Sequence, residues 1–502
     1  MRGVFLSIIL KIFHLQKSLV PLEKKGLIII LVDGLGYKAL SRTLKKGYGS
    51  FFLKLLKKGF RIFPYFCGVP ASTTATEAEL FFGTSENIPG FTWFDRSLSR
   101  FIRGNRGESI IEFEQLVKKR SELLMGGSCV LGIYSSSATQ CDLSGTQLNL
   151  KYPLRALRKL QYILFIFLNP LRLILTLYLI LKSLLMSIYV SGRGRSKKKF
   201  THLIKDAFSR IFLGNIASYI AELEIARETP VLFIDFVLYD EFAHEYGVNN
   251  RISYSSIRLI DWYCKSLYQA AKNSKRKYDF IVLSDHGQAP SNQLKGQNSL
   301  ENMMKSALNN SSHRVVKTFG FPSPDPHEKN VYLVPVGSTV HIYFSESLKK
   351  PMFAQKLEKK FPHIIDKLLK NPEIGWILIR SGDGAQSFVG RRGTIEFKDG
   401  KVRRVSGSPL TGFVSDGRVV TSLARYASFE NNGDLVLFGS VDDGGSVQSF
   451  EDHRGTHGGF YGDMTEPFIL TENKSVIDQL RKNNEMGPVF ESIRASYGTD
   501  KL

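Results

Sequence analysis

Three stretches of the chain are almost wholly apolar and stop abruptly at polar residues. They are GLIIILVDGLG (26–36), VLFIDFVLYDEFAH (231–244) and YDFIVLSDHG (278–287). A strand that is buried on both faces has this continuous apolar character. Helical periodicity lies between them, as in 251–272, where Ile252, Ile257, Ile260 and Leu267 recur among polar residues. Buried strands that alternate with helices predict an α/β fold with a mainly parallel, doubly wound central sheet flanked by helices.

The pattern changes after residue 300, where glycine, proline and short β-type runs become frequent. Such runs are NVYLVPVGSTVHIYF (330–344), GWILIRSG (375–382) and GDLVLFGS (433–440). They predict a smaller α+β subdomain beside the α/β domain. The expected organisation is an N-terminal apolar or amphipathic segment (1–25), a catalytic α/β domain (26–150 and 201–309), a hydrophobic-basic helical insert (151–200), an α+β continuation (310–440) and a return to the catalytic domain (441–502).

The insert contains a long apolar segment, QYILFIFLNPLRLILTLYLILKSLLMSIYVSGRGRSKKKF (161–200). Asn169 and Pro170 break its first part, and only nine uncharged residues separate Arg172 from Lys182. A spanning helix needs about 20 mostly apolar residues. On a helical wheel a narrow polar stripe stands beside a wide apolar arc; the stripe consists of Arg172, Thr176, Ser183 and Ser187. This pattern favours an interfacial helix, or a lid packed on apolar surface, over a simple span, and a buried helix hairpin is the alternative.

The positive charge of the chain is concentrated in the same region. The formal net charge is +22, and residues 151–200 hold eleven Lys and Arg but no Asp or Glu. A cluster of Arg193, Arg195, Lys197, Lys198 and Lys199 follows the apolar run, where it can meet anionic headgroups. The basic excess does not interleave with aromatic residues, so we do not expect a nucleic-acid partner. We expect association with an anionic membrane surface through 161–199, and the basic flank favours the cytoplasmic face.

The opening of the chain does not favour a signal peptide. The opening MRGVFLSIILKIFHLQKSL has a short apolar run that Lys11 and His14 interrupt, and no clear small-x-small cleavage site follows. An amphipathic opening helix is therefore expected instead of a signal peptide. The four cysteines form no CxxC pair, which argues against a disulfide scaffold and fits a reducing compartment.

Carboxylates and imidazoles cluster at the predicted strand ends and in one glycine-rich loop. They are Asp33, Asp240, His244, Asp285, His286 and, in RGTHGGFYG, His457. The carboxyl ends of parallel strands meet at one edge of a sheet, where open α/β sheets bind ligands. Taken singly, each residue could cap a turn or lie exposed. Together, three aspartates and three histidines suit Zn²⁺ or Mn²⁺ better than Ca²⁺, and six ligands are enough for two ions.

A candidate nucleophile lies in GVPASTTATEAELFFGTSENIPGFTWFD (68–95). Its run of small hydroxyl residues leads into a helix-like stretch. A hydroxyl at a helix N-terminus sits where backbone N–H groups and the helix dipole favour anions. Ser72, Thr73 and Thr74 are the candidates, although helix capping is the usual role of such residues.

The order of these motifs resembles the alkaline phosphatase superfamily, and within it the type I phosphodiesterase/nucleotide pyrophosphatase branch. The motifs are VDG after the first strand, Pro–Thr–helix, D-x-x-x-H, SDHG and G-T-H-G, and they cover most of 26–300 and 430–470. The phrase NIPGFTWFD is similar to a membrane-linked prokaryotic subgroup. The resemblance implies an alkaline-phosphatase-like fold. It also implies two metal sites, one formed by Asp33, Thr73, Asp285 and His286 and the other by Asp240, His244 and His457.

The resemblance further implies a metal-dependent phosphoric-ester hydrolase, a phosphodiesterase or phosphatase. Thr73 would be its nucleophile and form a phospho-threonine, because it lies three residues after Pro70 and ten before Gly83, the family's spacing. The cofactors would be two divalent ions, Zn²⁺ first and Mn²⁺ as the alternative. The apolar insert points to a lipid-linked substrate. A phospho-group transferase of the same superfamily, or a membrane-surface binding protein without activity, are the alternatives.

Overall fold

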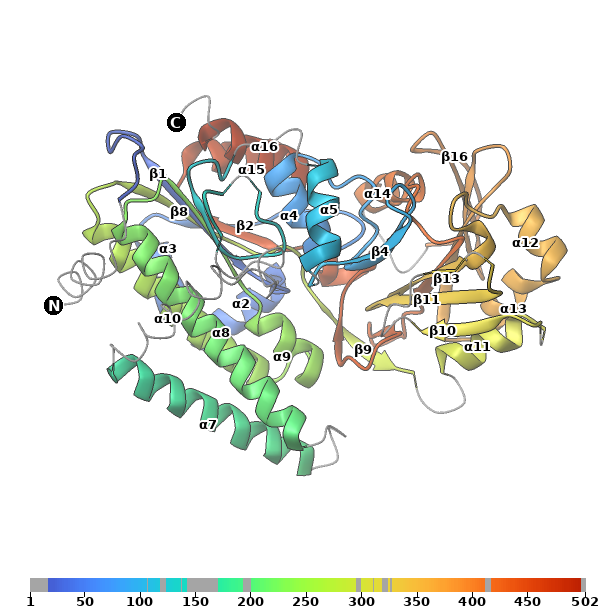
Figure 1. The fold of residues 1–502 in the computed structure, drawn as a ribbon, viewed down its shortest axis with the longest axis horizontal. Coiled ribbons are helices and arrows are strands. Elements are labelled where there is room, and N and C mark those ends of the chain that lie inside the picture. Colours follow the sequence, from blue (N-terminus) through green and yellow to red (C-terminus); the bar gives the residue numbers. More distant parts are fainter. Residues whose placement is uncertain are drawn as a thin grey trace.

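A computed structural model describes most of the chain. The described residues are 17–105, 107–117, 123–136, 138–141, 170–192, 200–294, 299–309, 311–317, 324–325, 327–410 and 417–497. The first part of the apolar insert and the basic cluster between residues 193 and 199 lie outside them. Two sheets dominate the fold, and Figure 1 shows the central sheet on the left and a second sheet on the right.

The central sheet has seven strands in the order β2-β20-β8-β1-β7-β5-β6. Its middle strand β1 (Gly26–Val32) runs parallel to β7 (Val231–Phe236) and to β8 (Tyr278–Leu283). The remaining strands are β2 (Arg61–Pro64), β5 (Ser128–Leu131), β6 (Gln140–Cys141) and β20 (Phe468–Thr471). Six of the seven strands point in the same direction, and β20 is antiparallel to both of its neighbours, β2 and β8. The predicted mainly parallel sheet is confirmed, and each of the three apolar runs forms one of its central strands.

Both faces of the central sheet are covered, which explains why β1 is apolar throughout. Ile28, Ile30 and Val32 enter one core and Leu27, Ile29 and Leu31 the other. The first core includes side chains of α2 (Tyr37–Lys45), α3 (Ser50–Lys57), α8 (Phe200–Ala226), α9 (Leu238–Tyr246) and α10 (Arg251–Asn273). The second includes side chains of α4 (Thr73–Phe82), α5 (Gly107–Val117), α15 (Lys474–Lys482) and α16 (Met486–Tyr497).

The second sheet has eight strands in the order β10-β11-β12-β17-β13-β14-β15-β16. They are β10 (Arg314–Lys317), β11 (Asn330–Val336), β12 (Thr339–Phe344), β13 (Ile374–Arg380), β14 (Gln386–Gly390), β15 (Gly393–Lys398), β16 (Lys401–Gly407) and β17 (Leu435–Gly439). Its helices are α11 (Leu300–Ala307), α12 (Ala354–Lys360), α13 (Ile364–Lys370) and α14 (Gly417–Ala427). This sheet occupies the stretch expected to form the α+β subdomain.

Smaller elements join the two sheets. The hairpin β3 (Thr92–Asp95) and β4 (Arg100–Arg103) follows α4, while β9 (Ala289–Gln293) pairs with β18 (Val447–Ser449) and β19 (Gly455–Thr456). The short helical turns are η3 (Ser345–Ser347) and η4 (Gly462–Thr465). The β9 group brings the chain after β8 next to the last glycine-rich loop.

The apolar insert contains one described helix, α7 (Pro170–Gly192), which packs along α8 as the outermost layer in Figure 1. It begins at the proline where the sequence predicted a break. Among the described residues, no helix has both the length and the apolar character needed to cross a membrane.

A buried arginine fastens the edge of the central sheet opposite to the carboxyl ends of β1, β7 and β8. Arg276 is fully buried, and its guanidinium donates hydrogen bonds to four backbone carbonyls. The acceptors are Val20, Pro21, Lys24 and Glu228, at 2.6–2.9 Å. These bonds tie the segment before β1 to the segment before β7.

Arg276→Ala should lower the free energy of unfolding by about 2–4 kcal/mol, because it leaves buried carbonyls without donors. Urea unfolding followed by circular dichroism measures the change. The control is Lys275→Ala at the neighbouring exposed position, which should leave the midpoint unchanged. Equal midpoints for the two variants would show that Arg276 does not hold this edge.

Candidate active site

All seven residues singled out from the sequence lie near the carboxyl edge of the central sheet. Asp33 follows β1, Asp240 and His244 lie on α9 after β7, and Asp285 and His286 follow β8. Thr73 begins α4, and His457 follows β19. The fold thus gathers residues that are up to 424 positions apart in the chain.

The ligand atoms form two overlapping groups. One atom each of Asp33, Asp285 and His286 lie within 4.8 Å of one another, and so do atoms of Asp240, His286 and His457. His244 stands beside the second group, with its Nε2 3.1 Å from Oδ2 of Asp240. The motif resemblance places His286 in the first group alone. In the structure this histidine lies between the two groups and belongs to both.

Three imidazoles are held in the same way. Nδ1 of His244 donates to the carbonyl of Gly455 at 2.7 Å, Nδ1 of His286 to that of Gly287 at 3.0 Å, and Nδ1 of His457 to that of Ala71 at 2.9 Å. A carbonyl only accepts, so each Nδ1 carries a proton and each Nε2 faces the carboxylates. Metal-binding histidines are oriented by this kind of bond.

The carboxylates lack enough donors to satisfy them. Within the described part of the chain, Oδ1 of Asp33 and Oδ2 of Asp285 are buried and accept no hydrogen bond. Burial, and then the charges of Asp285 and Asp240, raise the pKa of Asp33 well above its usual value. This crowding favours a cation, either a proton or a metal ion.

The second group shows how the site responds to charge without a metal ion. Burial raises the pKa of Asp240, but the neighbouring His244 and His457 outweigh it, so the net shift is downward. Burial lowers the pKa of His244, but Asp240 outweighs it and raises the pKa to about 9. Burial and His286 hold the pKa of His457 well below its usual value, which leaves its Nε2 free to accept. A proton and a metal ion therefore compete for the face of His244 that meets Asp240.

The nucleophile loop distinguishes its three hydroxyls. Oγ1 of Thr73 lies 3.4 Å from Nε2 of His286. Oγ1 of Thr74 donates to the carbonyl of Gly90 at 2.9 Å and lies 2.9 Å from Oγ of Ser72. Thr73 therefore faces the ligand groups, whereas Ser72 and Thr74 are engaged with each other.

Two glycines allow these loops to approach. Gly34 has a φ of 72°, and a Cβ there would lie 2.5 Å from Oδ1 of Asp240; its N–H donates to Oδ1 of Asp285 at 3.0 Å. A Cβ on Gly458 would lie 2.4 Å from the carbonyl oxygen of Val336. Larger residues would separate the loops that bring the ligands together.

The second sheet supports the last ligand. The turn between β11 and β12 holds the carbonyl of His457 through the N–H and the hydroxyl of Ser338, both at 2.9 Å. The N–H of Gly337 in the same turn donates to Glu451 at 2.6 Å. His457 is thus fixed between the two sheets.

Sequence reasoning missed two neighbours of Asp240 and His244. Gln288 donates from Nε2 to Oδ1 of Asp240 at 2.5 Å and to its backbone carbonyl at 3.2 Å. The ring of His453 stacks against His244 with centroids 4.0 Å apart. Gln288 follows SDHG directly, so its place in that loop was the available signal.

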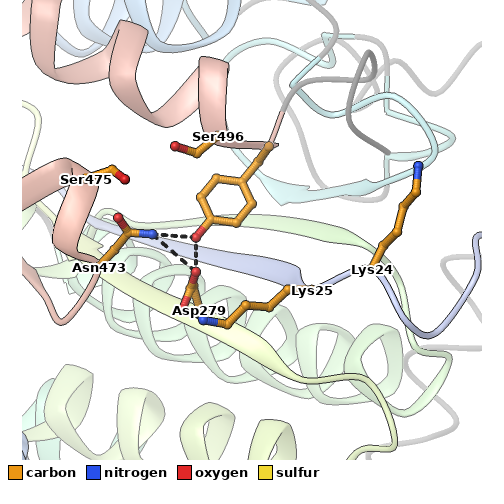
Figure 2. A pocket seen from close by; sticks show the side chains of 7 residues that line it. Lys24, Lys25, Asp279, Asn473, Ser475 and Ser496 are labelled. Atoms are coloured by element: carbon orange, nitrogen blue, oxygen red, sulfur yellow. Dashed lines mark hydrogen bonds and ion pairs between the residues drawn. The ribbon is translucent and has the colours of Figure 1, made fainter.

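A cavity also lies at the opposite edge of the sheet and does not belong to this site. Figure 2 shows Asn473 directed at the carboxylate of Asp279, beside Lys25. The hydroxyl of Tyr497 donates to the same carboxylate. Its residues come from the start of β8 and from the C-terminal helices. These contacts satisfy Asp279, in contrast to Asp33 and Asp285 at the carboxyl edge of the sheet.

Comparisons with known proteins agree with this picture. The family model described as type I phosphodiesterase / nucleotide pyrophosphatase matches residues 166–368, less than half of the chain. That stretch contains Asp240, His244, Asp285 and His286. A search of curated proteins finds no sequence match.

Solved structures show the fold. The chain is similar to wild-type alkaline phosphatase PafA, with a TM-score of 0.50 and 12% identity over 90% of this chain and 91% of that one. Phosphonoacetate hydrolase from Sinorhizobium meliloti 1021 gives a TM-score of 0.46 at 12% identity, covering 95% and 97% of the two chains. Murine ectonucleotide pyrophosphatase / phosphodiesterase 5 gives 0.41 at 13%, covering 89% and 88%. The alkaline-phosphatase-like fold is confirmed, and the family match supports a hydrolase of phosphoric esters.

Glu77, one turn after Thr73 on α4, generates a prediction about stability and pH. Its carboxylate accepts hydrogen bonds from the N–H groups of Ile133 and Tyr134 at 2.8 and 3.3 Å, and its Oε1 is buried without a donor in the described structure. Burial raises the pKa of Glu77 to about 8, although these two bonds oppose the shift. The folded protein therefore holds a proton that the unfolded chain loses near pH 4.5.

The stability that this proton provides is fully present below pH 4.5 and is lost as the pH rises through about 8. Glu77→Gln keeps an acceptor but cannot ionise. The free energy of unfolding of the variant, relative to that of the wild type, should therefore rise by on the order of 3 kcal/mol between pH 5 and pH 9. Urea unfolding at several pH values, with the metal content held constant, measures the difference. Glu86→Gln at an exposed position is the control, and parallel pH profiles for Glu77→Gln and the wild type would contradict the assignment.

Proposed function

We propose that this protein is a two-metal phosphoric-ester hydrolase with Thr73 as its nucleophile. The observation that carries the proposal is the common orientation of His244, His286 and His457. Each imidazole is anchored through Nδ1, and each presents Nε2 to a buried carboxylate. This is the donor set of a Zn²⁺ or Mn²⁺ site, and the undonated oxygens of Asp33 and Asp285 fit it.

The residues divide between two ions. Asp33, Thr73, Asp285 and His286 would hold one, and Asp240, His244 and His457 the other. Bound ions of this kind lower the pKa of a coordinated hydroxyl or water, orient it for in-line attack and stabilise charge on the leaving oxygen. Gln288 fixes the carboxylate of Asp240, and Gly34 lets the loops of the two groups meet.

Thr73 acts at the N-terminus of α4. Its hydroxyl attacks phosphorus, the bond to the leaving alcohol breaks, and a phospho-threonine forms. Water then attacks the phosphorus and releases phosphate, or a monoester, while Thr73 regains its proton. Backbone N–H groups in the first turn of α4 favour the negative phosphoryl group, because their hydrogen-bonding capacity is not used within the helix.

The substrate is a phosphoric mono- or diester, and we infer a lipid-linked one. The supporting observation is the apolar insert beside the catalytic domain, with its eleven basic residues between 151 and 200. The similarity of NIPGFTWFD to a membrane-linked prokaryotic subgroup points the same way. Association with an anionic membrane at its cytoplasmic face would bring such esters to the site.

The proposal predicts the metal content. After reconstitution with Zn²⁺ or Mn²⁺, the protein should retain about two ions per chain, because two ligand groups are present. His457→Ala and Asp285→Asn should each lower the retained metal by about one ion, as each removes a ligand from one group. Elemental analysis by mass spectrometry after dialysis measures the content.

The control for the metal measurement is His363→Ala, which alters an exposed histidine on the second sheet's side of the molecule. It should retain as much metal as the wild type. A wild-type protein that keeps no metal after reconstitution would overturn the two-metal proposal.

The second prediction concerns the nucleophile. Thr73→Ala should lower kcat on bis(p-nitrophenyl) phosphate and p-nitrophenyl phosphate by about 10³-fold or more, because the hydroxyl that faces the ligand groups is lost. The matched variant Thr74→Ala loses the bonds of its hydroxyl to the carbonyl of Gly90 and to Ser72, and it should remain active. If Thr74→Ala were inactive and Thr73→Ala active, the assignment of Thr73 as the nucleophile would be wrong.

Product analysis separates hydrolysis from transfer. With an acceptor alcohol present, a transferase yields a new phosphoric ester, whereas a hydrolase yields mainly the product of water attack. Acid quenching and peptide mapping during turnover should locate a phosphoryl group on Thr73.

A further inference from the structure

Helix α7 packs Leu173, Leu179 and Ile180 against the core and leaves a second apolar face exposed. Seven of the fifteen exposed large apolar side chains among the described residues lie on this one helix. They are Ile174, Leu177, Tyr178, Leu181, Leu185, Ile188 and Tyr189, with exposed fractions of 38–63%. We call this set the α7 ridge. Scattered surface apolar residues are ordinary, but a continuous patch of this kind marks a binding surface.

The ridge is continuous because of its spacing. At about 100° per residue, the seven side chains fall within an arc of about 120°. Thr176 and Ser183 lie on the opposite side of the helix, where Thr176 is buried and accepts a hydrogen bond from Asn215 of α8 at 2.5 Å. Thr176 of the predicted polar stripe therefore meets α8, whereas the α7 ridge faces outward.

We propose that the α7 ridge docks on the surface of an anionic lipid bilayer. Interfacial helices place one apolar face at the boundary between headgroups and acyl chains, and many are 20–30 residues long. With 23 residues, α7 fits that range. Tyr178 and Tyr189 have amphipathic rings that suit the membrane–water boundary, and Lys182 flanks the ridge where its ammonium can reach headgroups.

Charge selects the lipid over a second copy of this chain. Residues 151–200 carry eleven positive and no negative side chains. This excess attracts an anionic surface and repels the same region of another copy.

The area of the ridge leads to the same choice. A helix face about 34 Å long and about 10 Å wide offers about 340 Å². A stable protein interface buries about 800 Å² on each partner. The ridge alone is therefore too small for a stable dimer.

The position of α7 relates the ridge to the active site. Thr176 lies 16 residues before the end of α7, and Asn215, which donates to it, lies 15 residues after the start of α8, so the two helices run antiparallel. In Figure 1 the start of α8 lies on the same side of the molecule as α9, which carries Asp240 and His244. The substrate would then be a phosphoric ester in the headgroup region. This last step rests on the proposed function, whereas docking itself needs no turnover.

Vesicle co-sedimentation of the full-length protein tests the proposal. Binding is compared on phosphatidylcholine alone and on phosphatidylcholine mixed with phosphatidylserine. The wild type should prefer the mixed vesicles, and high salt should weaken binding without abolishing it, because salt screens only the charged part. Leu181→Gln/Leu185→Gln should reduce partition onto mixed vesicles by about tenfold or more, because two apolar side chains leave the contact.

The matched control is Leu53→Gln/Leu116→Gln, which changes two exposed leucines on α3 and α5 and should bind as the wild type does. A second pair on the ridge, Ile174→Gln/Tyr178→Gln, tests the same surface independently in case the first variant misfolds. Circular dichroism checks that both variants are folded. Wild-type binding by both ridge variants would overturn the proposal, and so would equal binding of the wild type to both kinds of vesicle.

Sedimentation velocity without lipid identifies the competing occupant. A wild-type dimer that the ridge variants dissociate, together with no vesicle binding, would assign the ridge to a second copy and overturn the membrane proposal. A monomeric wild type that binds mixed vesicles supports it. Since none of these measurements requires turnover, a failure of the hydrolase proposal would appear separately in the phosphoester assays.

Discussion

Carboxylates that stand together at a buried sheet edge repel one another, and the architecture around them must offset that repulsion. Burial, and then Asp285 and Asp240, push the pKa of Asp33 upward. Each imidazole donates its Nδ1 proton to a backbone carbonyl and directs Nε2 at the carboxylates, so only a ring that is also protonated at Nε2 offsets their charge. His244, whose pKa is raised to about 9 because Asp240 outweighs its burial, can keep a second proton and donate it in a hydrogen bond to that carboxylate, but the low pKa of His457 keeps that ring neutral. The arrangement is therefore best satisfied by divalent cations, which supply more charge in the same space.

Holding such a cluster requires support from both sheets. The parallel strands bring Asp33, Asp285 and α9 to one edge, as this topology requires. His457 arrives from far along the chain and depends on the β11–β12 turn, where Ser338 fixes its carbonyl. The second sheet thus contributes to the site by positioning a loop, although the seven candidate residues lie outside it. This explains why the last glycine-rich loop contacts the turn so closely that Gly458 has no room for a Cβ.

The parts of the fold that were predictable are those with a strong local signal. Continuous apolar runs identified β1, β7 and β8. The residues that follow these strands lie together, because the carboxyl ends of neighbouring parallel strands meet at one edge of the sheet. Contacts between side chains that lie far apart in the sequence had no such local signal. Nothing local shows that Gln288 would reach Asp240, or that His453 would stack on His244, because both contacts depend on how β9 and β19 pair. The choice of Thr73 over Thr74 likewise rested on spacing, and the structure adds that Thr74 donates to Gly90.

The sequence could also not predict which way the polar residues of α7 face. Amphipathicity alone places polar residues toward water, yet Thr176 is buried against Asn215 while the apolar side chains of the α7 ridge remain exposed. That reversal bears on how the enzyme reaches its substrate. A carboxylate-rich edge without metal ions repels an anionic lipid surface. An apolar ridge inserts regardless of the sign of the surface, and a region with eleven basic residues attracts it. The two features together would let a negative catalytic edge work close to a negative membrane.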